Sequence, residues 1–199
     1  STPTNSNTNE VPANDGLELG GLPKATYKVL DPHDDLNMSQ STNDSYPTAI
    51  KIALILRNAK LVAELEQLSA PFKAKGKLYL KIVKMGRTEL QDAVPMTVGQ
   101  EFYAFAASLD GEIQLLRDAE KYLYSQNMGA TAIGTGLNAP EGYAERCAYH
   151  LAQITGKPIV PAGDMLAATW DQQGFVVYSG ALKSVANKLS KIASDLILL

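Results

Sequence analysis

Long stretches of helical periodicity, with apolar side chains on more than one face, constrain the fold of this sequence most. The longest stretch begins near Tyr46-Pro47 and runs to Gln67 or beyond, because proline is tolerated in a first turn and Asp44 or Ser45 can cap it. One face carries Ile50, Ala53, Leu54, Leu61, Leu65 and Leu68, and another carries Ile52, Ile55 and Leu56. A helix that is apolar on several sides needs several neighbours, so the pattern predicts a helical bundle.

Three further helices are expected. Residues 94–124 have apolar residues in steps of three and four, with Gly111 as a candidate kink: Phe102, Phe105, Ala106, Leu109, Ile113, Leu116, Ala119 and Leu123. Another helix is expected at 141–154, and the last runs from Phe175 onward, with Val177, Ala181, Val185, Leu189, Ile192 and Leu196. The β-prone residues 78–83 fit either a short strand or a helix end.

The N-terminal part is polar and rich in turn formers. Residues 1–16 hold many Asn and Thr side chains, which suit caps, turns and ligand contacts. A weak helix is expected at Val11–Leu22, which contains proline and glycine, and 23–40 reads as a loop. We therefore predict an all-α, long-helix bundle in which residues 1–45 form a loop-rich segment and residues 46–199 begin the bundle domain, whose core continues into other subunits.

Composition excludes several classes of protein. With 45% hydrophobic and 20% charged residues, the chain is globular rather than disordered, and a net charge of -3 argues against nucleic acid as a partner. Cys147 is the only cysteine, which points to a reducing, cytoplasmic compartment. No run approaches the ~18 apolar residues of a membrane span, and no signal peptide is visible. The chain lacks an initiator Met and closes inside a helical pattern, so we expect a missing segment at each end.

Three polar segments are candidates for chemistry. Ser41-Thr42-Asn43-Asp44 precedes the longest helix, where a helix terminus favours an anion such as a carboxylate, or it is an ordinary capping cluster. The segment from Gly86 to Asp92 is a polar turn expected to lead into a helix. There Thr88 can donate a hydrogen bond, and Arg87 either binds a carboxylate or pairs internally with Asp92.

The third segment, Gly129–Asn138, is a glycine-rich loop without the spacing of a Walker loop or a dinucleotide fingerprint. It either lets backbone approach a ligand or reverses the chain between helices. Isolated candidates are weaker: we expect a solvated loop around His33, Asp31, Asp34 and Asp35 rather than a metal site. His150 is expected at the surface, Cys147 as a small core residue, and Trp170 and the tyrosines in packing.

Taken together, these segments resemble the aspartase and fumarase superfamily. The resembling residues are Thr8–Val11, Ser39–Thr48, Lys84–Thr88, Leu90–Thr97 and Gly129–Asn138, and they are more similar to the aspartases than to the fumarases. The resemblance implies an all-α fold and a homotetramer around a central helical bundle, with each active site assembled from three subunits. It also implies reversible anti elimination of ammonia from L-aspartate to give fumarate.

Carried over residue by residue, the resemblance implies substrate-binding roles for Thr2, Ser41, Thr42, Asn43 and Thr88. Glu89 is counted with them, although fumarases resemble one another in having His there and many aspartases have Gln. The family's base is a serine on a mobile loop, which is expected beyond Leu199, so the 199-residue chain is expected to be inactive alone. No cofactor is implied; magnesium activates some aspartases, but no metal ligands are identified.

Two alternatives remain open at this point. One is a fumarate hydratase or a related dicarboxylate lyase, which shares the same fold and the same binding segments. The other is a non-catalytic, truncated helical subunit that only oligomerises. Residues encoded beyond Leu199 would distinguish the second alternative from an enzyme.

Overall fold

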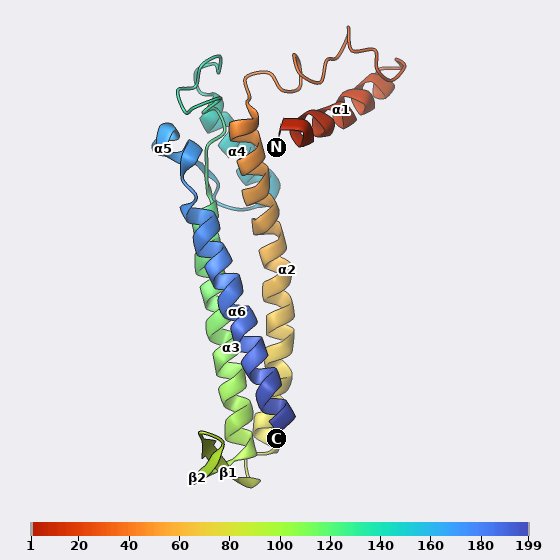
Figure 1. Ribbon diagram of the computed structural model, residues 1–199. Helices are drawn as coiled ribbons and strands as arrows, with labels where there is room; N and C mark the ends of the chain where they lie inside the picture. Colours follow the sequence, from red (N-terminus) through yellow and green to blue (C-terminus); the bar gives the residue numbers. More distant parts are fainter. Residues whose placement is uncertain (1, 199) are drawn as a thin grey trace. The chain divides into compact units, whose positions relative to one another are not determined.

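The computed structural model describes residues 2–198 and is mainly helical (Figure 1). The helices are α1 Thr2–Leu19, α2 Thr42–Leu78, α3 Val98–Glu120, α4 Tyr143–Thr155, α5 Met165–Trp170 and α6 Gln173–Leu198, with a 3-10 turn at Lys121–Leu123. The strands are β1 Val83–Thr88, β2 Gln91–Thr97, β3 Ser125–Gln126 and β4 Val160–Pro161. The all-α prediction is confirmed, because the strands form only an antiparallel hairpin (β1 and β2) and a short parallel pair (β3 and β4).

The described chain divides into two compact units. Unit 1 comprises residues 1–54 and 123–172, and unit 2 comprises 55–122 and 173–199. Helix α2 contributes its first turns to unit 1 and its remainder to unit 2. The predicted domain boundary between residues 45 and 46 stays a prediction.

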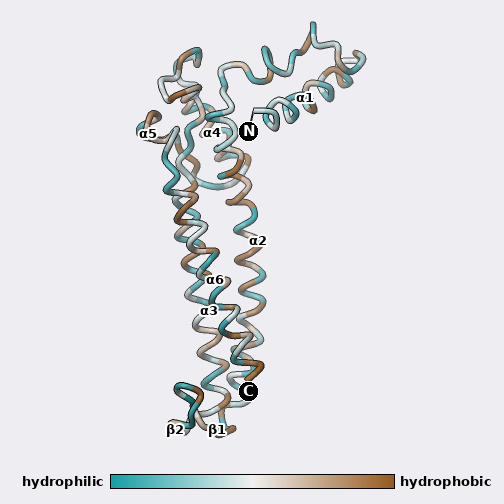
Figure 2. The backbone as a smooth tube through the Cα atoms, in the orientation of Figure 1, coloured by the Kyte–Doolittle hydropathy of each residue, from teal (hydrophilic) through white to brown (hydrophobic). Residues whose placement is uncertain are grey.

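The core of unit 2 lies between α3, α6 and the later turns of α2. All eight apolar residues predicted to line the helix after residue 94 are buried: seven, from Phe102 to Ala119, lie on α3, and Leu123 belongs to unit 1. On α6, Ala181, Val185 and Ile192 are buried as predicted. Tyr178 is buried instead of its neighbour Val177, which was the predicted core residue, and Leu196 is exposed. Hydrophobic residues recur along α2, α3 and α6 between hydrophilic ones (Figure 2). Helix α3 continues through Gly111.

The buried stripe of α2 differs from the predicted faces. The stripe follows steps of three, four and seven residues: Thr48, Ile55, Asn58, Val62, Leu65, Ser69 and Phe72. Leu56 and Leu68, which were expected on apolar faces, are 52% and 39% exposed. Two of its polar members are buried with partners: Asn58 donates to Glu120 at 2.6 Å and accepts from Tyr178 at 3.0 Å, and Ser69 donates to Asp110 at 2.7 Å.

A hairpin replaces the helix start that was expected near residue 94. Helix α2 ends at Leu78, strands β1 and β2 pair antiparallel, and α3 begins only at Val98, where Thr97 and Gln100 form a capping box. The register pairs Gly86 with Val94 but Arg87 with Asp92, so one extra residue forms a bulge in β2. The segment 86–92 is therefore a turn within a hairpin and does not lead directly into a helix.

The N-terminal helix of unit 1 is longer than predicted. It begins at Thr2 and contains Pro12, and three of its asparagine side chains bind the loop that follows: Asn5 and Asn9 donate to Asn37 at 3.0 Å, and Asn14 accepts from Ala25 at 2.8 Å. Residues 23–40 form turns, as predicted. Among residues 2–198, no helix combines the length and apolar character needed to cross a bilayer.

Helix α4 follows the predicted range within two residues at its start and one at its end. His150 is exposed as expected, and Cys147 is half-buried rather than fully in the core. The prediction that Trp170 packs inside is wrong for this chain, because its side chain at the end of α5 is 74% exposed.

Candidate functional site

Ser41, Thr42 and Asn43 lie at the start of α2 in unit 1. The Ser41 hydroxyl accepts the Asn43 N–H at 3.2 Å, and the Asp44 carboxylate accepts the Ser41 N–H at 2.8 Å. The Ser41 hydroxyl thus caps the second N–H of the helix, and the Asp44 carboxylate binds back to the N–H of the cap residue, so the capping interpretation of the quartet is confirmed. A capping role does not prevent Ser41 from binding a ligand. Its hydroxyl oxygen accepts one hydrogen bond, and the hydroxyl can still donate its hydrogen to an acceptor such as a carboxylate.

The glycine-rich loop lies directly against this helix start. Asn43 donates its side-chain amide to the Ala132 carbonyl at 2.7 Å, and Asn127 donates its own to the Asn43 carbonyl at 3.0 Å. The loop reverses sharply, with positive φ at Gly129, Thr131, Gly134, Gly136 and Asn138. The loop thus reverses the chain, as one of its two interpretations expected, while the approach of its backbone to a ligand stays a prediction.

Thr2 is exposed at the first turn of α1. One turn further along α1, the Asn5 side chain accepts a hydrogen bond from the Ser45 hydroxyl at 3.2 Å. This bond joins α1 to the first turn of α2. Thr2, Ser41, Thr42 and Asn43 thus belong to elements that are hydrogen-bonded to one another within unit 1.

Thr88 and Glu89 lie in unit 2, at the tip of the hairpin. Thr88 pairs with Gln91, and the two residues between them, Glu89 and Leu90, have φ of 53° and 63°. Two consecutive positive φ angles are those of a type I′ hairpin turn. Both turn residues are exposed, and the Thr88 side chain is exposed beside them.

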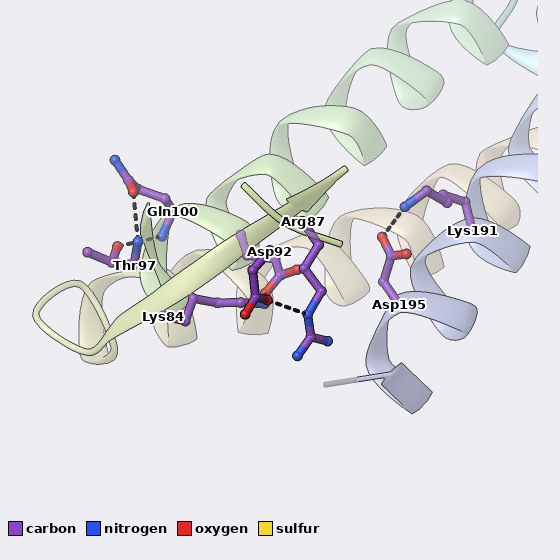
Figure 3. A network of polar contacts seen from close by, with 8 residues as sticks. Lys84, Arg87, Asp92, Thr97, Gln100, Lys191 and Asp195 are labelled. Carbon is purple, nitrogen blue, oxygen red and sulfur yellow. Dashed lines mark hydrogen bonds and ion pairs between the residues drawn. The ribbon is translucent and has the colours of Figure 1, made fainter. Parts of the chain in front are cut away.

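Arg87 pairs internally, as one of its two interpretations expected. Its Nε lies 3.4 Å from an Asp92 oxygen on the opposite strand, and both side chains are more than half exposed (Figure 3). An exposed, long ion pair of this kind stabilises a fold only slightly. The guanidinium is therefore held by Asp92 only weakly.

A cavity of about 620 Å³ lies beside the hairpin within unit 2. Its charged lining comes from the hairpin, α3 and α6: Lys84, Arg87, Glu89, Glu101, Lys191 and Asp195. Lys84 and Glu101 form its most enclosed ion pair, at 2.6 Å and about one fifth exposed, and Lys191 pairs with Asp195 on α6 (Figure 3). Its lining is thus mixed in sign, with the tip residue Glu89 at its edge.

Two further candidates are Asp44, which the sequence placed in the candidate quartet without a substrate-binding role, and Asn127, which the sequence did not single out. Asp44 is fully buried, and burial raises the pKa of its carboxyl, while backbone N–H groups of Ser41, Thr131, Ser45 and Gly129 oppose that rise. Asn127 is 1% exposed, and its side-chain oxygen is buried without a hydrogen-bond partner. The available signal was that both stand in or next to segments already chosen as candidates.

Two further groups of unit 1 have shifted pKa values: Lys51 on α2, and Asp31 in the loop that also holds Asp34 and Asp35. Burial lowers the pKa of the Lys51 ammonium, which donates to the Ser125 carbonyl at 2.8 Å, and the charge of Asp171 opposes that shift. In the loop, backbone N–H groups of Asp34 and His33 lower the pKa of Asp31 by donating to its carboxylate. The acidic residues there serve a turn, and no cluster of three or more His, Cys, Asp or Glu in the described part of the chain could hold a metal ion.

Comparison with known proteins assigns this chain to a protein family. The family described as Lyase matches residues 1–199. Aspartate ammonia-lyases of Pseudomonas aeruginosa and Escherichia coli K12 are 52% and 50% identical to the chain, covering 100% of it and 42% and 41% of their own lengths. The chain therefore spans about two fifths of the length of these curated relatives.

Solved structures agree with the sequence comparison. The fumarate lyase:delta crystallin of Brucella melitensis bound to cobalt matches with a TM-score of 0.96 and 48% identity, covering 98% of this chain and 42% of its own. The class II fumarase of Schistosoma mansoni matches with a TM-score of 0.88 and 30% identity, covering 96% and 43%. The chain therefore belongs to the Lyase family, in the aspartase and fumarase superfamily, and is about 50% identical to aspartate ammonia-lyases of that superfamily.

Proposed function

We propose that this chain is the substrate-binding part of an aspartate ammonia-lyase, which converts L-aspartate reversibly to fumarate and ammonium. The observation that carries the proposal is identity of about half to aspartate ammonia-lyases over the whole chain. The 30% identity to a class II fumarase is lower, which makes fumarate hydration the second choice.

The reaction breaks a carbon–hydrogen and a carbon–nitrogen bond and forms a carbon–carbon double bond. A base takes the proton from the carbon beside one carboxylate, negative charge spreads into that carboxylate, and the protonated amino group leaves the next carbon as ammonia, which then takes up a proton to become ammonium. In this proposal Thr2, Ser41, Thr42, Asn43 and Thr88 hold the two carboxylates and the amino group. Neutral hydroxyl and amide donors suit this task, because preorganised hydrogen bonds stabilise charge that develops in the transition state.

The proposed division of labour assigns the base to a serine outside these 199 residues. The hydroxyl and amide side chains named above supply binding and charge stabilisation, but no strong base is among them. The full-length enzyme is proposed to work without a redox cofactor, in the cytoplasm, and as a homotetramer with shared active sites. Exposed apolar side chains on the bundle helices, such as Leu56 and Leu68 on α2 and Leu182 on α6, support subunit packing.

The test compares the full-length protein with the 199-residue chain, each purified from a host that lacks its own lyases. The full-length protein should form fumarate from L-aspartate, as detected by ultraviolet absorbance. Its mass measured by light scattering should be that of a tetramer. The 199-residue chain alone should show no turnover. Robust turnover by the short chain would contradict the assignment of the base, and faster turnover of L-malate than of L-aspartate by the full-length protein would favour a fumarate hydratase. A folded, oligomeric, full-length protein that is inactive on both substrates would favour the non-catalytic subunit.

A further inference from the structure

The Asp44 carboxylate joins two segments that are 87 residues apart in sequence. One oxygen accepts the Ser41 N–H at 2.8 Å, and the other accepts the Thr131 N–H at 2.9 Å. The backbone N–H groups of Ser45 and Gly129 also act on this carboxylate, since they lower its pKa. An ordinary capping box needs only the bond to Ser41, so the bonds to the glycine-rich loop exceed what helix capping requires.

The loop residue that Asp44 holds is in an uncommon conformation. Thr131 has φ of 58°, which is rare for a β-branched residue, and its side chain is 6% exposed. Such a conformation persists only where the surroundings fix it. The bond from its N–H to Asp44 is one such constraint, and the bond from the Thr131 hydroxyl to the Ala130 carbonyl at 2.7 Å is another.

The glycine-rich loop and Asn127, two residues before it, also hold Asn43, a predicted substrate contact, from two directions. Its side chain donates to Ala132, the residue after Thr131, and its carbonyl accepts from Asn127. Any shift of Thr131 and Ala132 therefore moves the acceptor that orients the Asn43 amide. Asp44 controls that shift from inside the protein, because it is fully buried and has no exposed surface through which to meet a substrate.

We infer that Asp44 is a positioning residue of this enzyme: its carboxylate fixes the glycine-rich loop against the start of α2 and so sets the orientation of the Asn43 side chain toward the substrate. The inference rests on the proposed function for its catalytic consequence. The structural part, the attachment of the loop to α2 through Asp44, is independent of which reaction the enzyme performs.

A double-mutant cycle in the full-length enzyme tests the catalytic part. Asp44→Asn should lower kcat/KM for L-aspartate on the order of 10²-fold, the size expected when a reacting group is misplaced by about 1 Å. In an Asn43→Ala background the same change should cost no more than roughly threefold, because the group that Asp44 orients is already absent. Equal losses in both backgrounds would overturn the inference and leave Asp44 as a helix cap. If Asp44→Asn does not fold, Asp44→Glu replaces it in the same cycle.

Two further measurements separate this inference from the proposed function. Glu112→Gln is a matched control, because Glu112 is also a buried carboxylate but lies on α3 in unit 2; it should leave kcat/KM within roughly threefold of wild type. Hydrogen exchange of the 129–134 amides should be at least roughly tenfold faster in Asp44→Asn than in wild type. If the wild-type enzyme does not act on L-aspartate, the proposed function fails, while hydrogen exchange still decides the attachment: unchanged exchange overturns it.

Discussion

Gly99 at the start of α3 lies against Gly76 in the last turns of α2, within unit 2. A β-carbon at Gly99 would be 2.4 Å from the Gly76 carbonyl oxygen and 2.5 Å from the α-carbon of Leu80. Both contacts are with backbone, which cannot rotate away as a flexible side chain can. The chain turns from α2 into the hairpin and back into α3 at a distance that only glycine permits.

This contact predicts opposite effects for two glycines of one helix. Gly99→Ala should lower the free energy of unfolding by at least about 2 kcal/mol, because the added methyl group forces backbone apart. Gly111→Ala, in the middle of the same helix with nothing within 4 Å of the new methyl group, should raise it by up to about 1 kcal/mol. Urea unfolding of the 199-residue variants measures both. The same sign for both changes would contradict the close approach.

Asn43→Ala and Thr88→Ala should each lower turnover of L-aspartate by the full-length enzyme on the order of 10²-fold, because each removes one donor that serves the transition state. Both side chains are exposed, so their loss should cost folding little. Steady-state kinetics and thermal melting on the same preparations separate the two effects. A lower Tm with unchanged kinetics would show that these residues only form the helix start and the hairpin.

Glu89→Gln should reduce the preference of the full-length enzyme for L-aspartate over L-malate. A carboxylate within ~4 to 6 Å of the substrate amino group stabilises ammonium over a neutral hydroxyl. If Glu89 instead lies beside a substrate carboxylate, the change removes repulsion and binding of both dicarboxylates improves. The measurement is the ratio of inhibition or turnover by the two compounds across pH. A ratio that moves at no pH would remove Glu89 from the active site.

The turn at Glu89-Leu90 uses two residues that pay a conformational penalty at positive φ. Leu90→Gly should therefore raise the free energy of unfolding by about 0.5 to 1 kcal/mol, because glycine adopts φ > 0 readily and the Leu90 side chain is 76% exposed. Val94→Gly in strand β2 is the control and should lower stability, because its φ is ordinary for a strand. A destabilised Leu90→Gly would mean that the leucine side chain has a partner in the assembled enzyme.

Helices α2 and α3 differ in how directly the sequence indicates their buried faces. The apolar stripe of α3 was predicted residue by residue, because an amphipathic helix with one core face shows its period directly. The stripe of α2 was not, because Asn58 and Ser69 occupy core positions and only their partners, Glu120 and Asp110, explain why. Apolar residues such as Leu56 lie outside the buried stripe. Counting apolar residues alone therefore assigns the core to the wrong faces of α2.

The site shows the same limit at longer range. The Ser41–Asp44 quartet and the loop from Gly129 could each be chosen from local composition. That Asp44 and Thr131 bond to each other could not, because the contact depends on how the intervening chain folds. The hairpin was missed for a related reason: its turn residues, Glu89 and Leu90, carry none of the Asn or Gly signals of a type I′ turn.

Tyr143 at the start of α4 should make the stability of the chain fall in alkaline solution. Burial raises the pKa of its phenol from the ordinary value of 10.0 to about 12, and its hydrogen bond to the Cys147 thiol and the charge of Asp44 act in the same direction, against a hydrogen bond from Gln40. The folded state therefore holds this proton more tightly than the unfolded state. The resulting stabilisation is fully present below about pH 10 and is lost as the pH rises through about 12.

Tyr143→Phe removes this titration, so the loss of unfolding free energy between about pH 9 and pH 11.5 should be smaller in the variant than in wild type. Urea unfolding at a series of pH values measures it, with the phenol titration followed by ultraviolet difference absorbance. Tyr149→Phe, a change at a ring that is 61% exposed, is the control and should keep the wild-type slope. If Tyr143→Phe also keeps that slope, the phenol ionises as easily in the folded chain as in the unfolded one, and its burial against Cys147 does not persist in solution.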